Sequence, residues 1–197
     1  CGAVLDVVKC FNHLPRLPLF GVLKHLGAPP PILRAWAQAL TSMERRFSIR
    51  GSVGEAIKST TGFAEGCSLS VVAMVGANEL VATWMAHKAP TTNLISFVDN
   101  LELFCRDPHE LMRSTQKLEE ILSLLDLEVD NSKTYLWSTH GNFRKVFLNN
   151  GFNVKTAARD IGAHLQYSRQ ATNFTITCKI ESFKNRWKSL ALSPATY

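Results

Sequence analysis

Residues 96–104 read SFVDNLELF, in which an acidic turn separates two short runs rich in apolar residues. Apolar runs on either side of a short turn favour a β-hairpin. A hairpin here would present the carboxylate of Asp99 close to its tip, and hard metal cations prefer oxygen ligands of this kind. The segment therefore predicts two paired strands with a candidate metal ligand between them.

A second carboxylate lies in a similar setting near the start of the chain. Residues 3–11 read AVLDVVKCF and predict a buried strand that carries Asp6. Burying an unpaired carboxylate is costly, so such a group is normally hydrogen-bonded, paired with a basic residue or bound to a cation. Either aspartate alone is best explained as the cap of a neighbouring turn. Taken together with the segment between them, the two strands favour a shared metal site.

The segment between the two strands contains a loop with two glycines. Residues 61–70 read TGFAEGCSLS and run directly into VVAMVGANEL, which predicts a long buried helix. Glycine lets the backbone approach a ligand closely, and a helix N-terminus favours a phosphate or a polar base edge. By itself, a glycine-bearing loop before a helix is more commonly a plain turn.

In this order, the segments resemble the palm motifs of reverse transcriptases, with retroelements that lack long terminal repeats as the nearest relatives. Residues 6–11 resemble the first motif, an aspartate followed five residues later by an aromatic residue. Residues 62–70 resemble the glycine-rich second motif, and residues 97–100 resemble the third, an aromatic residue before a pair of aspartates. Residues 127–134 are similar to the fourth motif, which ends in Lys-Thr.

A fifth and weaker match is similar to the Leu-Gly hairpin that grips the primer in this family. It spans residues 159–165, and Gly162 and Ala163 stand at the gripping positions. Any one of these motifs would occur by chance. Five of them in the family's order, over about residues 3–168, are a specific signal.

The resemblance implies an α+β fold, the palm of a polymerase, in which an antiparallel sheet is backed by helices. It places a palm fragment at residues 1–170 and the start of a helical thumb at residues 171–197. Because the chain starts only five residues before Asp6, we expect the fingers to be missing. The fingers and the rest of the thumb would then belong to the remainder of a polyprotein.

The chemistry implied by the resemblance is two-metal nucleotidyl transfer, in which divalent ions bind the attacking primer hydroxyl and the departing pyrophosphate. The shared ligands of two Mg²⁺ ions, or of Mn²⁺ in their place, would be Asp6 and Asp99, with Asn100 beside them. Lys133 would protonate the pyrophosphate. For Lys133, a surface lysine after a turn is an equally good explanation.

The resemblance also assigns residues to the nucleotide. Phe11 would be the steric gate against a ribose 2′-hydroxyl, and Glu65 and Gly66 of the glycine loop would line the nucleotide site. Without the motif, Phe11 is more simply explained as a core residue at a strand end.

The sequence departs from the family's pattern at three motifs. Asn100 stands in place of a second aspartate, Ala64 and Glu65 replace Pro-Gln, and Asn12 stands where many members carry aspartate. Asparagine still offers a neutral oxygen to a hard cation, so Asn100 lowers the charge of the site without removing its oxygen. A carboxylate at Glu65 repels an incoming polyanion unless a metal or a basic residue compensates.

Composition and charge agree with a single domain that binds nucleic acid. The chain has 197 residues, 46% of them hydrophobic, and we expect neither a membrane span nor a signal peptide. Its five cysteines lack Cys-x-x-Cys spacing, which favours a reducing compartment. Residues 131–197 carry ten basic and two acidic residues. This basic third suits a phosphate backbone, although a solvated helix face explains it equally well.

Two functions follow from these observations. The first is a fragment of an RNA-directed DNA polymerase of a retroelement, intracellular and expected in the nucleus, which would add dNTPs to a DNA primer on an RNA template. The second is a degenerate, catalytically inactive palm that only binds nucleic acid. Asn100 and Glu65 fit both hypotheses.

Local patterns predict further elements between the motifs. The helix start is clearest at Asp107, an N-cap that precedes Pro108 at the first helical position. The apolar stripe of this helix should cover the sheet; it consists of Leu111, Thr115, Leu118, Leu122 and Leu125. Other expected elements are a helix at residues 32–47, a hairpin of residues 47–50 and 55–60 around a turn at 51–54, short strands within 129–138 and 154–176, and an amphipathic helix at 177–192.

Overall fold

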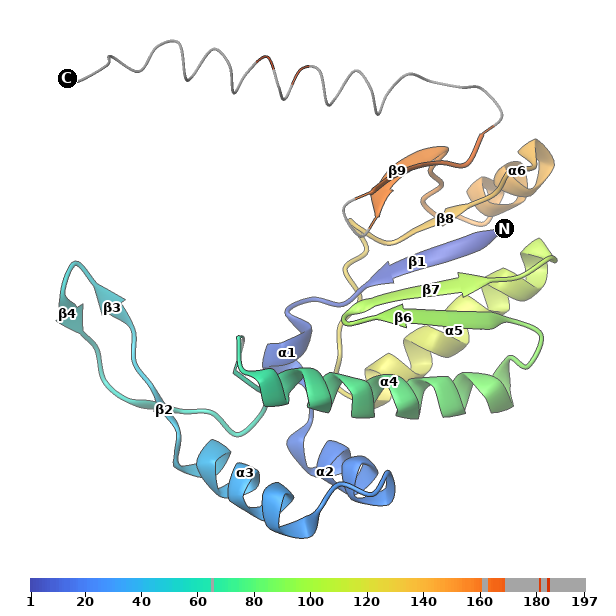
Figure 1. The fold of residues 1–197 in the computed structure, drawn as a ribbon. Helices are drawn as coiled ribbons and strands as arrows, with labels where there is room; N and C mark the ends of the chain where they lie inside the picture. The colour runs from blue at the N-terminus through green and yellow to red at the C-terminus, as the bar shows by residue number, and fades with distance from the viewer. Residues whose placement is uncertain (65, 161–162, 169–180, 182–183, 185–197) are drawn as a thin grey trace.

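The computed structural model describes residues 1–64, 66–160, 163–168, 181 and 184. A four-stranded antiparallel sheet lies at its centre, in the strand order β6-β7-β1-β8 (Figure 1). The strands are β1 (Gly2–Asp6), β6 (Asn93–Phe97), β7 (Asn100–Phe104) and β8 (Tyr135–Trp137). Both of the strands predicted to carry aspartates are therefore present, and they belong to one sheet.

The two faces of this sheet differ in character because successive side chains of a strand point to opposite faces. Leu5 of β1 and Leu101 and Leu103 of β7 are at most 1% exposed and pack against the helices α4 (Ser68–Lys88) and α5 (Pro108–Leu124). The other face, which we call the open face, carries Asp6, Asn100 and the aromatic rings of β7 and β8. The predicted α+β fold, an antiparallel sheet backed by helices, is confirmed.

Helix α5 forms as its sequence predicts. The Asp107 carboxylate accepts a hydrogen bond of 3.1 Å from the backbone N–H of His109, and Pro108 occupies the first turn. An N-cap of this kind satisfies one of the donors that a helix N-terminus leaves unpaired. All five residues of the predicted stripe are buried: Leu111, Thr115, Leu118, Leu122 and Leu125.

Helix α4 is the long apolar helix that the sequence predicts after the glycine loop. Among the described helices, it alone has the length and composition of a membrane span, with 21 residues and a mean hydropathy of 1.4 over its most apolar window. Its buried face, which includes Ala73, Ala77 and Val81, belongs to the core shared with α2 and α5. Glu79 interrupts the apolar run.

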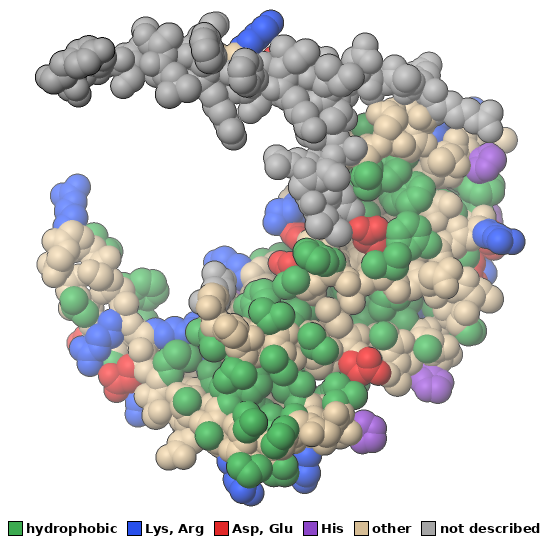
Figure 2. Space-filling model, viewed as in Figure 1, with side chains coloured by type: hydrophobic (Ala, Val, Ile, Leu, Met, Phe, Trp, Pro, Cys, Tyr) green, Lys and Arg blue, Asp and Glu red, His purple; other side chains and the backbone are tan. Residues whose placement is uncertain are grey.

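The segment between β1 and α4 forms three helices and a projecting arm (Figure 1). The helices are α1 (Cys10–His13), α2 (Arg16–His25) and α3 (Pro30–Ser42). The arm consists of β2 (Glu44–Arg45) paired with β5 (Ile57–Lys58), and of β3 (Ser48–Ile49) paired with β4 (Ser52–Val53). Figure 2 shows Lys and Arg side chains along the arm and at its base.

Two predictions in this segment need correction. The helix predicted at residues 32–47 ends at Ser42, because Met43 is already extended. The hairpin turn is formed by Arg50 and Gly51, with φ of 49° and 84°, and not by residues 51–54. Positive φ at both central residues defines the two-residue turn whose twist matches that of paired strands. This turn moves the register of the arm relative to the prediction.

The last part of the described chain adds one element that the sequence analysis missed. Helix α6 (Gly141–Asn149) buries Phe147, but its N-cap residue, His140, makes no side-chain capping bond and its first turn holds no acidic residue. The usual sequence signals of a helix start are therefore lacking. A hairpin of β9 (Ala157–Asp160) and β10 (Ala163–Gln166) follows. Apart from residues 181 and 184, the predicted thumb and the helix at 177–192 lie outside the described residues.

Gly2 lies on the open face, where neighbouring atoms leave no room for a side chain. A Cβ atom at this position would lie 2.7 Å from the Trp137 ring and 2.8 Å from the carbonyl oxygen of Leu103. We expect Gly2→Ala to lower the free energy of unfolding by about 1–3 kcal/mol through overpacking. The measurement is the midpoint of urea unfolding.

Gly21 of α2 is the matched control, because an added Cβ there would meet nothing within 4 Å. Gly21→Ala should raise the free energy of unfolding by about 0.5–1 kcal/mol, since alanine favours the helix. Equal effects of the two substitutions would contradict this account of Gly2.

Candidate active site

The strand ends of the open face bring the candidate metal ligands together. Asp6 ends β1 and lies opposite Asn100, the first residue of β7. Asp99 directly precedes Asn100, in the two-residue turn between β6 and β7. The Asp6 side chain is 17% exposed, so it is accessible from the open face without being fully solvated. The sequence-predicted residues Asp6, Asp99 and Asn100 therefore lie at neighbouring strand ends, at the same edge of the sheet.

The turn that presents Asp99 is strained. Val98 has a φ of 58°, a conformation that is unfavourable for a β-branched residue. Asn78 of α4 donates a hydrogen bond of 3.1 Å from its side-chain amide to the carbonyl oxygen of Val98. Strained backbone persists where its surroundings hold it, often at functional sites. Asn78 was not among the predicted site residues; its one signal in the sequence is that it is polar within the apolar run of α4.

Lys133 contacts Asp6 directly. Its Nζ atom lies 2.7 Å from Oδ2 of Asp6 and 3.4 Å from Oδ2 of Asp130. The hydrogen bond to Asp6 is the main reason that the pKa of Lys133 is raised. The backbone N–H of Asp130 also donates to the carbonyl oxygen of Asp6, at 2.8 Å. The segment that resembles the fourth motif thus wraps the end of β1.

The glycine loop is docked against the segment that carries Phe11. The backbone N–H of Phe63 donates to the carbonyl oxygen of Phe11 at 2.7 Å, and that of Gly62 donates to Leu14 at 3.0 Å. Gly62 has a φ of 73°, and a Cβ atom here would lie 2.1 Å from the carbonyl oxygen of Asn12. Only glycine permits so close an approach of two backbones.

Arg16 holds the same loop from its other side. Its guanidinium donates four hydrogen bonds, all to backbone carbonyl oxygens; the acceptors are Leu40, Ser59, Thr61 and Gly62, at 3.3, 2.7, 3.0 and 2.8 Å. These acceptors belong to the end of α3 and to the chain that returns from the arm. No sequence pattern singled out Arg16, because its partners are backbone atoms.

A pocket of about 560 Å³ lies between the glycine loop and the aspartate turn. Phe11, Gly66 and Asp99 line it, together with Ser70 and Val71 from the start of α4. Three residues that the sequence assigned to nucleotide and metal therefore share one cavity. Of the other two residues so assigned, Asp6 is not among the residues that line this pocket, and Glu65 lies outside the described residues.

Cys10 lines this pocket but is chemically inert there. Burial raises the pKa of its thiol to about 12, with smaller contributions from the charges of Asp99 and Asp6. The thiol stays neutral at physiological pH, and it contacts the Met74 sulfur at 3.6 Å. Cys10 is thus a core residue, as the sequence suggested for each cysteine.

The donor set at the strand ends fits a hard divalent cation. Asp6 and Asp99 supply carboxylate oxygens and Asn100 an amide oxygen, the ligand types that Mg²⁺ and Mn²⁺ prefer. Within the described residues, no three His, Cys, Asp or Glu side chains are grouped to share a metal ion. The amide at Asn100 replaces what would be a third carboxylate next to Asp6.

The candidate primer grip is only partly described. Gly162 lies outside the described residues, and Ala163 begins β10 opposite Asp160. This hairpin is joined to the open face by aromatic contacts of Tyr167, whose ring stacks on Trp137 with centroids 4.4 Å apart and an interplanar angle of 13°. Tyr167 is buried in a small cluster with Val4 of β1 and Tyr135 of β8.

Comparisons with known proteins agree on the kind of fold. The family described as "Reverse transcriptase (RNA-dependent DNA polymerase)" matches residues 1–175. Among solved structures, a telomerase from Candida albicans in complex with a TWJ fragment of telomeric RNA is similar, with a TM-score of 0.63 and 14% identity. An apo telomerase from Candida tropicalis, truncated from its C-terminal domain, is also similar, with a TM-score of 0.59 and 12% identity. No curated protein matches the sequence.

The telomerase structures are much longer than this chain. In both cases 84% of this chain is covered, against 30% of the first telomerase and 34% of the second. The chain thus spans about a third of the length of these structures. At such low identities the likeness shows the fold alone.

The close approach of Gly62 to Asn12 can be tested with a matched pair of glycines. Gly62→Ala should lower the free energy of unfolding by about 3 kcal/mol or more, because the added Cβ must displace backbone. Gly66 has a similar φ of 80°, but nothing lies within 4 Å of its Cβ position. Gly66→Ala should therefore cost only about 1 kcal/mol. Urea unfolding of both variants measures the difference, and equal losses would refute the tight docking of the loop.

Proposed function

Because this chain belongs to the reverse transcriptase family, we propose that it is the catalytic palm of an RNA-directed DNA polymerase. It would add dNTPs to the 3′-hydroxyl of a DNA primer on an RNA template by metal-assisted nucleotidyl transfer. The observation that carries the proposal is the pairing of Asp6 with Asn100 next to Asp99, since Asp99 lines a pocket together with Phe11 and Gly66.

Each side chain has a role that follows from its position. Asp6 and Asp99 would hold Mg²⁺, which when bound supplies positive charge that offsets the charge developing on the transferred phosphate. Phe11 lines the pocket, where its ring would limit the space beside the sugar and disfavour a ribose. Lys133 would leave Asp6 and donate a proton to the departing pyrophosphate.

The wider setting is also proposed. The motif order supports a parent protein from a retroelement without long terminal repeats, with palm at residues 1–170 and the start of a thumb at 171–197. The rest of the parent would supply the remaining contacts to template, primer and dNTP. An intracellular, nuclear location of the activity is part of the same proposal.

A second candidate function is a palm that binds primer–template without catalysing synthesis. Asn100 favours it, because the amide lowers the negative charge where divalent ions would bind. Binding would then depend on basic residues and fall steeply with salt.

Substitutions at Asp99 and Asn100 in the full-length parent separate the two functions. Asp99→Asn should reduce Mg²⁺-dependent primer extension by about a hundredfold or more, because losing a shared ligand removes several kcal/mol of charge stabilisation. Asn100→Asp should preserve or increase extension. The measurement is the extension rate under one buffer, with primer–template binding as the control for folding. Equal, Mg²⁺-independent behaviour of wild type and both variants would leave only the binding function.

The contact of Lys133 with Asp6 predicts competition with divalent ions. Lys133→Met should strengthen Mn²⁺ binding by about two- to fivefold, the effect expected for one exposed ion pair. Titration followed by electron paramagnetic resonance measures free Mn²⁺ without any need for activity. Lys145→Met, an exposed lysine of α6, is the control and should leave the affinity unchanged. An unchanged affinity in Lys133→Met would show that the ammonium does not occupy the cation site.

A further inference from the structure

Two cysteines face each other at the end of the sheet opposite to Asp6. Cys1 precedes β1 and Cys105 follows β7, so they extend the register in which Gly2 lies opposite Phe104. Their backbones exchange both hydrogen bonds, Cys1 N to Cys105 O and Cys105 N to Cys1 O, each at 3.1 Å. The two residues therefore form a directly opposed antiparallel pair.

The geometry of such a pair suits a covalent bond between the side chains. Directly opposite residues point to the same face of a sheet, and a hydrogen-bonded pair has Cα atoms about 5.5 Å apart. Disulfides join residues whose Cα atoms are about 4.4–6.8 Å apart. The backbone at Cys1 and Cys105 is thus already at bridging distance.

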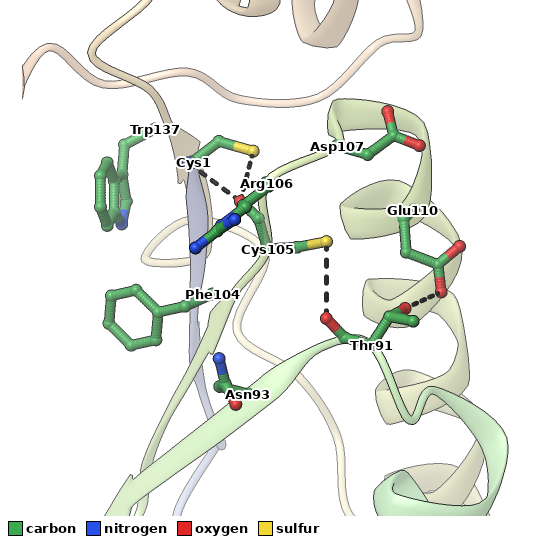
Figure 3. A pocket seen from close by; sticks show the side chains of 9 residues that line it. All are labelled: Cys1, Thr91, Asn93, Phe104, Cys105, Arg106, Asp107, Glu110 and Trp137. Carbon is green, nitrogen blue, oxygen red and sulfur yellow. Dashed lines mark hydrogen bonds between the residues drawn. The ribbon is translucent and has the colours of Figure 1, made fainter.

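The present side-chain contacts leave both thiols reduced and accessible. The Cys1 thiol donates to the carbonyl oxygen of Cys105 at 3.1 Å, and the Cys105 thiol to that of Thr91 at 3.9 Å. Figure 3 shows both sulfur atoms on the same side of the strands. Forming a bond between them requires rotation of both side chains and a slightly closer approach of the two strands, because opposite Cβ atoms lie about 4.5–5.5 Å apart and those of a disulfide about 3.5–4.5 Å apart. Both cysteines are partly buried and line a pocket of about 620 Å³.

The other described cysteines lack these features. Cys10 is buried and its thiol has a pKa of about 12, so it supplies almost no thiolate. Cys67 is exposed beside the glycine loop and lines the other pocket. Only Cys1 and Cys105 combine strand pairing, a shared face and access to solvent within the described part of the chain.

We propose that Cys1 and Cys105 are a redox modification site that forms a reversible disulfide across β1 and β7. The oxidant is a small-molecule disulfide such as oxidised glutathione. One cysteine thiolate attacks this reagent and releases one small thiol; the second thiolate then attacks the mixed disulfide and releases another. Two electrons pass from the cysteine pair to the reagent, whose S–S bond is replaced by the protein's, and the two cysteine protons end on the released thiols.

The bond would act on the sheet that carries the candidate active site. It would tie together the two strands that present Asp6 and Asn100, at the ends farthest from those residues. A crosslink between residues this distant in sequence stabilises chiefly by restricting the unfolded chain. This inference does not depend on the proposed polymerase activity.

The test is to incubate the reduced chain with oxidised glutathione, block free thiols by alkylation and digest with trypsin. Trypsin cleaves after Lys9, Lys88 and Arg106, so Cys1 lies in the peptide that ends at Lys9 and Cys105 in peptide 89–106, and fragmentation of the linked pair identifies the bonded residues. We expect this linked pair, its loss on treatment with dithiothreitol, and a rise in Tm of about 5–15 °C on oxidation.

Two variants complete the test. Cys105→Ser should abolish the linked pair and the rise in Tm, whereas Cys67→Ser should retain both. Circular dichroism confirms that each variant folds. The proposal is overturned if Cys1 and Cys105 stay free, if each carries glutathione without linking, or if either is linked to another cysteine.

Discussion

The register of β1 against β7 is the constraint on which the site depends. Leu5, Leu101 and Leu103 are sealed against the helices, and the side chains of a strand alternate between faces. A slip of one residue would turn Leu5 to solvent and drive Asp6 into the core, where a carboxylate is very costly. Core packing therefore sets the position of Asp6 opposite Asn100. The candidate metal ligands are thus aligned by hydrophobic side chains on the opposite face of the sheet.

A second constraint positions the glycine loop, and it is made almost entirely of backbone contacts. Gly62 lies against the carbonyl group of Asn12. The Arg16 guanidinium donates hydrogen bonds to carbonyl groups at the end of α3 and in the segment that leads from the arm back to the glycine loop. Carbonyl groups that turn inward at such a junction need donors, because unpaired polar groups are costly away from water. Arg16 provides several from one planar group. The pocket wall near Phe11 thus depends on a residue that does not line the pocket.

Local signals in the sequence predicted the parts of the fold that local chemistry determines. The hairpin around Asp99 and the cap of α5 at Asp107 are both predicted by residues that lie within a few positions of them in the sequence. The missed elements depend on distant contacts or lack a local signal. The N-cap residue of helix α6 makes no side-chain capping bond, and the burial of Phe147 is evident only in the folded chain. Arg16 could not be predicted because backbone acceptors leave no trace in the amino-acid pattern.

The same distinction applies within the site. The motif order was enough to bring Asp6, Asp99 and Asn100 together, but it said nothing of how Asp6 is neutralised. In the folded chain the Lys133 ammonium supplies that charge, 2.7 Å from the carboxylate, while 65% of the lysine side chain remains exposed. An exposed ion pair is weak enough to be exchanged for another cation at little cost. The ion pair with Lys133 therefore balances the charge of Asp6 when no metal is bound. The sheet can fold without a metal ion. A site arranged in this way keeps its geometry ready while leaving the carboxylate available, because the long, flexible lysine side chain can withdraw into solvent without disturbing the strands.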